Sequence, residues 1–125
     1  MTTYEVGKKL VDLCRANKAM EAIKTLYAPN IVSIEAMAMG PVAQRTEGLP
    51  AVIKKAEWWE GSHEVHKAEA EGPWPHGDRF IVRFKYDVTA KSGPMAGQRM
   101  SLDETGLYTV KDDKVVQEEF FYHMG

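Results

Sequence analysis

The first thirty residues place their apolar side chains at the spacing of amphipathic helices. The apolar face of residues 4–17 consists of Val6, Leu10, Leu13 and Cys14, with charged residues on the opposite face. A second apolar stripe runs to Leu26 and ends before Pro29, because the residue before a proline disfavours helical geometry. This pattern predicts two short helices that form a hairpin.

The next segment, residues 31–37, alternates in the manner of a β-strand. One side of this strand carries Ile31, Ser33, Glu35 and Met37. Glu35 is therefore a carboxylate on a strongly apolar strand. An isolated buried carboxylate either acquires a raised pKa or finds a partner. The alternatives are that Glu35 faces solvent or pairs with an arginine.

A loop and a third helix are predicted to follow. Residues 40–48 are rich in glycine and polar side chains, which is typical of a loop. Apolar positions then return at helical spacing, and the inner face of this helix is Leu49, Val52, Ile53 and Ala56. Trp59 falls at the edge of that face and Trp58 nearly opposite it, so the two tryptophans are expected to have different environments.

From Glu64 onward the spacing changes from helical to alternating. Residues 64–71 alternate up to Gly72 and Pro73, and residues 80–89 form an amphipathic strand whose aromatic face is Phe80, Val82, Phe84, Tyr86 and Val88. Two further strands, over residues 99–110 and ending at Tyr122, complete a predicted four-strand meander.

The turn between the last two strands decides which acidic residues face the interior. A three-residue loop over 111–113, with Asp113 in the left-handed conformation, places Glu104, Tyr108, Glu118 and Tyr122 on one face. A two-residue loop would place Glu119 and His123 there instead, because a slip of one residue reverses every side chain. We favour the three-residue loop, since an Asp-Asp turn tolerates the left-handed residue.

Composition narrows the class of protein. The chain has 125 residues, 44% hydrophobic and 27% charged, which predicts a single globular domain over residues 1–125. Its formal charge of −2 provides no basic field to attract nucleic acid. The single cysteine, Cys14, cannot form an internal disulfide, and no apolar run suggests a signal peptide or membrane span. We expect a cytoplasmic protein with neither nucleic-acid nor membrane partners.

This order of elements resembles the nuclear transport factor 2-like superfamily and, within it, the SnoaL-like domain proteins. The most specific segments are LYAPN at residues 26–30 with its continuation to residue 35, the helix over 48–59, and GLYTVKDDKVV at 106–116. The resemblance covers nearly the whole chain. It implies an α+β, cystatin-like fold in which a curved antiparallel sheet wraps around three N-terminal helices into a cone with a deep pocket.

Members of this superfamily include isomerases, cyclases, hydrolases and non-catalytic proteins, so the fold alone names no reaction. Ketosteroid isomerases have a pocket tyrosine at the end of the second helix and a strand carboxylate that moves the proton, which match Tyr27 and Glu35. Their oxyanion-hole tyrosine and second acid fall here on Val11 and Gly106. The resemblance therefore implies a pocket acid without the steroid oxyanion hole.

The expected site combines two catalytic carboxylates, Glu35 and Glu104, with a largely apolar wall. The expected substrate-binding residues are Tyr27, Met37, Trp59, His66, Phe84, Leu102, Tyr108, Glu118 and Tyr122. No metal or other cofactor is expected, because His63 and His66 are three residues apart on a predicted strand and point to opposite faces.

The expected function is binding of an apolar small molecule, with isomerase, cyclase or hydrolase chemistry by proton transfer at the pocket carboxylates. The alternative is a non-catalytic ligand-binding or interaction domain. In either case a homodimer through the outer face of the sheet is expected, because the apolar Leu107, Val115 and Phe121 are predicted to lie on that face.

Overall fold

A computed structural model describes residues 1–123 and contains three helices and six strands. The helices are α1 (Thr3–Arg15), α2 (Ala19–Leu26) and α3 (Leu49–Ser62). α1 begins with a capping box, in which the Thr2 hydroxyl accepts from the Glu5 amide and the Glu5 carboxylate accepts from the Thr2 amide. The predicted helix hairpin and third helix are confirmed.

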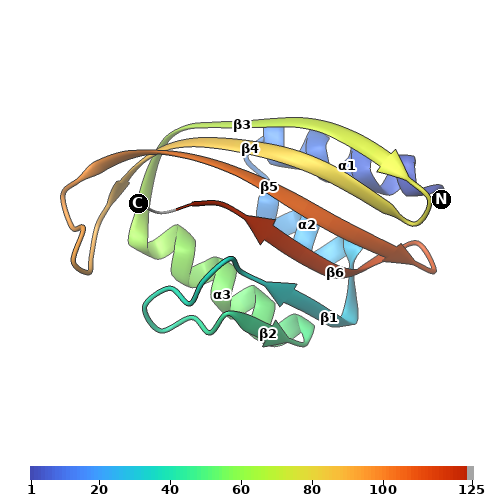
Figure 1. Cartoon of the computed structure of the whole chain (residues 1–125), viewed down its shortest axis with the longest axis horizontal. Helices are drawn as coiled ribbons and strands as arrows, with labels where there is room; N and C mark the ends of the chain where they lie inside the picture. The colour runs from blue at the N-terminus through green and yellow to red at the C-terminus, as the bar shows by residue number, and fades with distance from the viewer. Residues whose placement is uncertain (124–125) are drawn as a thin grey trace.

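The strands form one curved sheet in the order β2-β1-β6-β5-β4-β3. Their bounds are β1 (Tyr27–Ile34), β2 (Arg45–Glu47), β3 (His63–His76), β4 (Arg79–Ala90), β5 (Arg99–Lys111) and β6 (Lys114–Phe121). Figure 1 shows the sheet arching over α1 and α2, with α3 beside β1 and β2. The predicted fold class is confirmed.

The sheet differs from the expected one in two respects. It is mixed, because β1 runs parallel to β6 while all other neighbours are antiparallel. The segment predicted as a loop contains the short strand β2, whose three polar residues carry no hydrophobic alternation. The first strand also begins earlier than predicted, since Tyr27 already has extended backbone angles.

The β5–β6 hairpin has a different turn from the one predicted. Asp112 and Asp113 both have positive φ, and Lys111 pairs with Lys114, so the loop has two residues. A register shift then follows between Thr109 and Val110, after which even-numbered residues face one another as predicted. The register differs from the predicted one by two residues, so that Tyr108 lies opposite Glu118. Glu118 therefore faces the interior despite the wrong turn.

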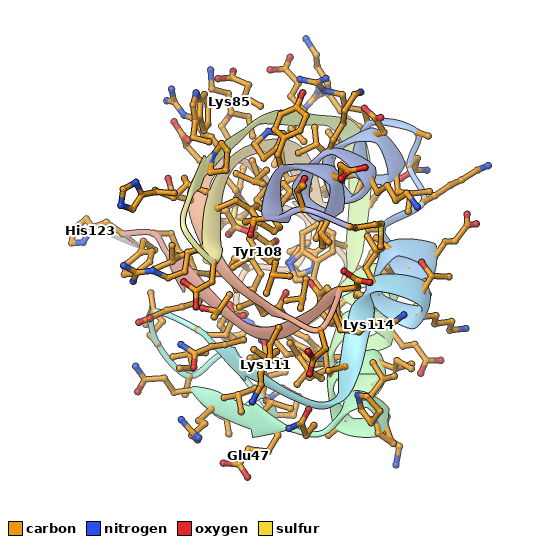
Figure 2. All side chains as sticks on the ribbon, turned by 90° about the vertical axis from the view of Figure 1, so that its right-hand side faces the viewer. Glu47, Lys85, Tyr108, Lys111, Lys114 and His123 are labelled. Atoms are coloured by element: carbon orange, nitrogen blue, oxygen red, sulfur yellow. The ribbon has the colours of Figure 1, made fainter. Side chains whose placement is uncertain are left out.

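The core lies between α1 and the concave face of the sheet. Val6, Leu10 and Val11 of α1 pack with buried side chains of β1, β4 and β5. Close packing depends on Gly7, where a Cβ atom would lie 2.8 Å from Cβ of Pro73 on β3. Figure 2 shows Tyr108 inside the molecule, whereas Lys85 lies at its edge. None of the helices described is long and apolar enough to cross a membrane.

Candidate functional site

A cavity of about 840 Å³ lies between the concave face of the sheet and the helices. This is within the range of about 300–1,000 Å³ typical of small-molecule sites. Its walls are largely aromatic and aliphatic, and include Trp58, Trp59, Phe84, Tyr86, Leu102 and Phe120. Residues 39–41 and 92–95, from the β1–β2 and β4–β5 loops, also line it.

Five carboxylates line this cavity. Glu60 and Asp103 are exposed, and the other three come from three neighbouring segments of the sheet. Glu35 directly follows β1, Glu104 is on β5 and Glu118 is on β6. The parallel β1–β6 pairing sets Ser33 opposite Glu118, and the antiparallel β4–β5 pairing sets Glu104 opposite Phe84. The inward-facing positions of the sheet thus place three acidic groups in a largely apolar chamber.

Glu118 is buried and accepts two hydrogen bonds from hydroxyl groups. The Tyr27 hydroxyl donates to Oε1 of Glu118, and the Ser33 hydroxyl donates to Oε2 at 2.6 Å. Burial raises the pKa of Glu118, and the hydrogen bonds from Ser33 and Tyr27 oppose that rise. Both carboxylate oxygens therefore have protein partners.

Glu35 is also buried, and its partner is a lysine from α3. The Lys55 ammonium forms an ion pair with Oε2 of Glu35 and donates to the Ser33 hydroxyl oxygen at 2.7 Å. The Tyr122 hydroxyl donates to Oε1 of Glu35 at 3.0 Å. A continuous polar chain thus connects the two carboxylates through Ser33 and Lys55.

Glu104 has no such partner. None of the residues described donates a hydrogen bond to its carboxyl group or forms an ion pair with it. No fully buried side-chain oxygen in the described chain lacks a partner, so the Glu104 oxygens must be accessible from the cavity. Among the three cavity carboxylates that are not exposed, it is the one whose oxygens are available to a ligand.

The surroundings of Glu104 change its acidity. Burial raises its pKa to about 7, the nearby charges of Glu35 and Glu118 add to the rise, and the Lys55 ammonium opposes it. A carboxyl group with this pKa exchanges its proton near neutral pH, where the work of a general acid or base is most effective.

The structure brings most of the predicted site residues together. Those that line the cavity are Glu35, Glu104, Tyr27, Trp59, Phe84, Leu102, Tyr108, Glu118 and Tyr122. Trp58, predicted to lie nearly opposite the inner face of α3, also contributes to the wall. Its ring and that of Trp59 both pack against His63 at the C-terminal end of the helix.

Two predicted site residues, Met37 and His66, lie elsewhere. Met37 follows the end of β1, where the alternation has ceased, and is 46% exposed. His66 falls at a register shift in β3, which turns its Nε2 to the Thr89 hydroxyl at 2.7 Å, away from the cavity. These two assignments are corrected.

The residue that the sequence analysis missed is Lys55. It lies three residues after Val52 and four before Trp59, so it shares their face of α3. The sequence feature that could have identified it is a lysine on the apolar face of a predicted helix. Its role depends on the packing of α3 beside β1, because its partners Glu35 and Ser33 belong to the β1 segment.

The Cys14 thiol is poorly suited to nucleophilic chemistry. Cys14 lines the cavity, but burial raises its thiol pKa to about 12, so the reactive thiolate is scarce at neutral pH. Within residues 1–123, no three histidine, cysteine, aspartate or glutamate side chains are grouped to hold a metal ion.

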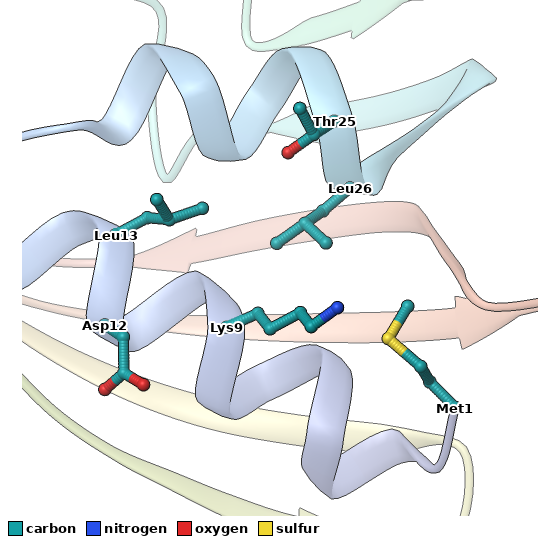
Figure 3. A pocket seen from close by; sticks show the side chains of 6 residues that line it. All are labelled: Met1, Lys9, Asp12, Leu13, Thr25 and Leu26. Atoms are coloured by element: carbon teal, nitrogen blue, oxygen red, sulfur yellow. The ribbon is translucent and has the colours of Figure 1, made fainter.

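A second depression of about 430 Å³ lies between α1 and α2. Figure 3 shows its lining, in which Lys9 extends toward Met1 while Asp12 points to another side of α1. Asp12 forms an ion pair with Lys8 at 3.0 Å. The depression contains none of the polar groups of the large cavity.

The curved sheet, its helices and its cavity define the class of small cone-shaped α+β proteins, and comparison with known proteins specifies the family. The sequence model of the SnoaL-like domain matches residues 1–122, so the chain belongs to the SnoaL-like family. A structure from Mesorhizobium loti, provisionally described as a SnoaL-like polyketide cyclase, is 41% identical and has a TM-score of 0.90. The alignment covers 98% of this chain and 100% of that one.

More distant structures share the fold. A Burkholderia thailandensis protein described as nuclear transport factor 2-like is 18% identical, with a TM-score of 0.80 and coverage of 98% of this chain and 92% of that one. A Bacillus subtilis protein provisionally described as an isomerase is 15% identical, with a TM-score of 0.75 and coverage of 98% and 90%. At these identities the likeness shows the fold alone. No curated protein matches the chain.

Proposed function

We propose that the protein is a cofactor-independent acid–base enzyme that isomerises or cyclises a small, largely apolar molecule, with Glu104 as the group that transfers the proton. The proposal rests on one observation, the unpartnered Glu104 carboxyl group in a large apolar cavity. With a pKa of about 7, this group is present as both acid and base at neutral pH. The cyclase and isomerase descriptions of similar structures are consistent with this chemistry.

This assignment changes the role expected of Glu35. The resemblance to ketosteroid isomerases implies that Glu35 moves the proton, but its oxygens are engaged by Lys55 and Tyr122. Removing a substrate proton with Glu35 would require breaking the ion pair. We assign Glu35 to positioning Lys55, and the proton transfer to Glu104.

The proposed step is proton abstraction beside a carbonyl group. The C–H electron pair forms a carbon–carbon double bond, the carbonyl π pair moves to oxygen, and Glu104 takes the proton. In a β,γ-unsaturated carbonyl compound, return of the proton from Glu104 to the γ-carbon restores the carbonyl group and gives the conjugated isomer. Alternatively, the enolate carbon attacks a second carbonyl carbon and closes a ring, the π pair of that carbonyl moves to its oxygen, and this oxygen takes the proton back from Glu104. Neither outcome requires an oxidant or reductant.

The test is exchange of substrate hydrogen for deuterium. A panel of enolisable ketones and 1,3-diketones is incubated in D₂O, and exchange at the α-carbon is followed by NMR. We expect Glu104→Gln to slow exchange by about 10²–10⁴-fold, the usual contribution of a positioned acid–base group. Glu57→Gln, an exposed position on α3, serves as the matched control. Equal exchange by Glu104→Gln and the parent protein would remove Glu104 from the mechanism.

A second candidate function is an interaction domain that dimerises through the outer face of the sheet. Trp74 and Phe121 are 53% and 49% exposed, and Trp74 is paired with the exposed Ile81. Val115, expected on this face, instead belongs to the core, because the bulge turns it inward. Sedimentation at micromolar concentration, with Trp74→Ser as the variant, tests whether this face joins two copies.

A further inference from the structure

Lys55 is held in one position at the wall of the cavity. Its side chain is 13% exposed, and its ammonium lies 5.6 Å from the ring centroid of Phe120. A lysine ammonium has three N–H donors. One donates to the Ser33 hydroxyl oxygen, and a second faces the Glu35 carboxylate, with which the ammonium forms an ion pair. The third has no acceptor among the described residues, and Lys55 lines the cavity.

The positions where ketosteroid isomerases supply oxyanion donors are closed in this chain. Val11 is an apolar residue packed in the core. At Gly106 an added Cβ would lie 2.7 Å from Cε2 of Tyr108, so the tyrosine ring occupies the space that a side chain would need. The hydroxyl groups of Tyr86 and Tyr108 also line the cavity, but Lys55 of α3 is the lysine or arginine in its lining and has both a positive charge and a spare N–H.

We propose that Lys55 binds and stabilises the substrate oxygen, and that the ligand is a carbonyl compound bound with its oxygen at this ammonium and its acidic carbon toward Glu104. This inference rests on the proposed function, because it supplies the charge that the proton transfer needs. When Glu104 takes the proton it becomes neutral and the carbonyl oxygen becomes an anion. Negative charge moves from Glu104 to a position beside a fixed cation, which stabilises the enolate.

The proposal also explains the polar chain around Lys55. Ser33 and Glu35 fix the ammonium from one side, so that its remaining N–H has a defined direction. Tyr122 holds Glu35 from the other side. Ser33, Glu35 and Tyr122 are therefore positioning residues, whereas Lys55 contacts the substrate.

The test uses 4-nitrophenol, whose phenolate imitates the enolate and absorbs visible light that the neutral phenol does not. It is performed in the Glu104→Gln protein, because the neutral amide imitates the protonated acid. We expect this protein to bind the phenolate at least about tenfold more tightly than the phenol, which is a shift of about one in the pKa of the bound probe. Glu104→Gln/Lys54→Met, altered at the exposed neighbour of Lys55 on α3, is expected to keep the preference.

The decisive variant is Lys55→Met combined with Glu35→Gln in the same background. Removing both charges leaves no unpaired buried carboxylate, so the fold is expected to survive, as checked by circular dichroism. We expect this protein to lose the phenolate preference, and Lys55→Arg to restore part of it. Phenolate preference that persists without Lys55, or that is missing in Glu104→Gln alone, overturns the proposal. The deuterium exchange experiment tests Glu104 separately, so the two proposals can fail independently.

Discussion

The Lys55–Glu35 ion pair predicts a specific pattern in protein stability. Both side chains are largely buried, with 13% and 6% of their surfaces exposed. Breaking such a pair by removing one partner leaves an uncompensated charge, whereas replacing both partners by neutral groups often costs little. The appropriate perturbation is therefore a double-mutant cycle of Lys55→Met and Glu35→Gln.

The magnitude follows from the contacts that survive each substitution. After Lys55→Met, Glu35 keeps only the hydrogen bond from Tyr122 at 3.0 Å. Loss of one partner of a buried pair typically costs about 3–5 kcal/mol, and the surviving bond favours the low end, about 3 kcal/mol. In the double variant neither partner leaves an unpaired buried charge. The main loss is the hydrogen bond from Lys55 to Ser33, which contributes about 1 kcal/mol to stability.

The assay is urea unfolding at pH 7, followed by the fluorescence of the three tryptophans and analysed by linear extrapolation. Glu35→Gln alone should cost about 1 kcal/mol, because the amide oxygen can still accept from the Lys55 ammonium. The expected coupling energy between the two sites is therefore about 3 kcal/mol. The matched control is Lys8→Met with Asp12→Asn, an exposed pair one helical turn apart on α1, for which about 0.3–0.5 kcal/mol is expected.

A coupling energy no larger than that of the surface pair would refute the reasoning. It would mean that, without Lys55, water or a rearranged side chain donates hydrogen bonds to Glu35 and stabilises its charge. The polar chain would then be too pliable to hold an ammonium for a substrate. Additive losses in the two single variants would have the same meaning.

Three further predictions concern other groups of the cavity wall. Glu104 has a folded-state pKa of about 7 against an ordinary value of 4.5, so the folded protein binds a proton more tightly than the unfolded chain, and its stability falls as the pH rises from 4.5 to 7. In urea unfolding, Glu104→Gln should remove about 2–3 kcal/mol of the stability loss between pH 5 and 8. Equal pH dependence of stability in the variant and the parent protein contradicts this. Cys14, with a thiol pKa of about 12, should react with iodoacetamide at pH 8 at least about 10²-fold more slowly in the folded protein than in urea, and comparable rates would contradict its burial. Gly106→Ala should lower stability by about 1–3 kcal/mol, because the added Cβ displaces the Tyr108 ring. The control Gly61→Ala on α3, where an added Cβ meets nothing within 4 Å, should be neutral or stabilising by up to about 1 kcal/mol. Similar thermal unfolding temperatures for the two variants would show that the Tyr108 ring moves aside at little cost.

Hydrophobic spacing was enough to predict the helices and the meander, because each amphipathic segment buries one face and its period is visible locally. Spacing does not specify which strands are neighbours. The parallel pairing of β1 with β6 joins segments that are far apart in the chain, and β2 is too short and polar to produce an alternating signal. Both depend on tertiary contacts that only the folded chain provides.

The candidate site was predictable where it depended on strand faces. Glu104, Glu118 and Tyr122 were placed inward by alternation, although the turn was wrong, because the bulge after the two-residue loop compensates for the error. Met37 and His66 were misplaced because alternation was extended past the end of a strand in one case and across a bulge in the other. Face assignments are therefore reliable only while a strand remains regular.

The three cavity carboxylates show why residue type alone cannot assign a catalytic role. Glu118 has two hydroxyl donors, and Glu35 has an ammonium and a hydroxyl. No donor to Glu104 is found within residues 1–123. The hydroxyl and ammonium partners of Glu118 and Glu35 occupy their carboxylate oxygens. A buried carboxyl group without donors takes up a proton more readily. The partners of Glu35 and Glu118 come from α3 and β1, so the difference arises from packing between elements. This packing leaves Glu104 with a pKa of about 7, and it places the Lys55 ammonium, which is paired with Glu35, at the wall of the same cavity.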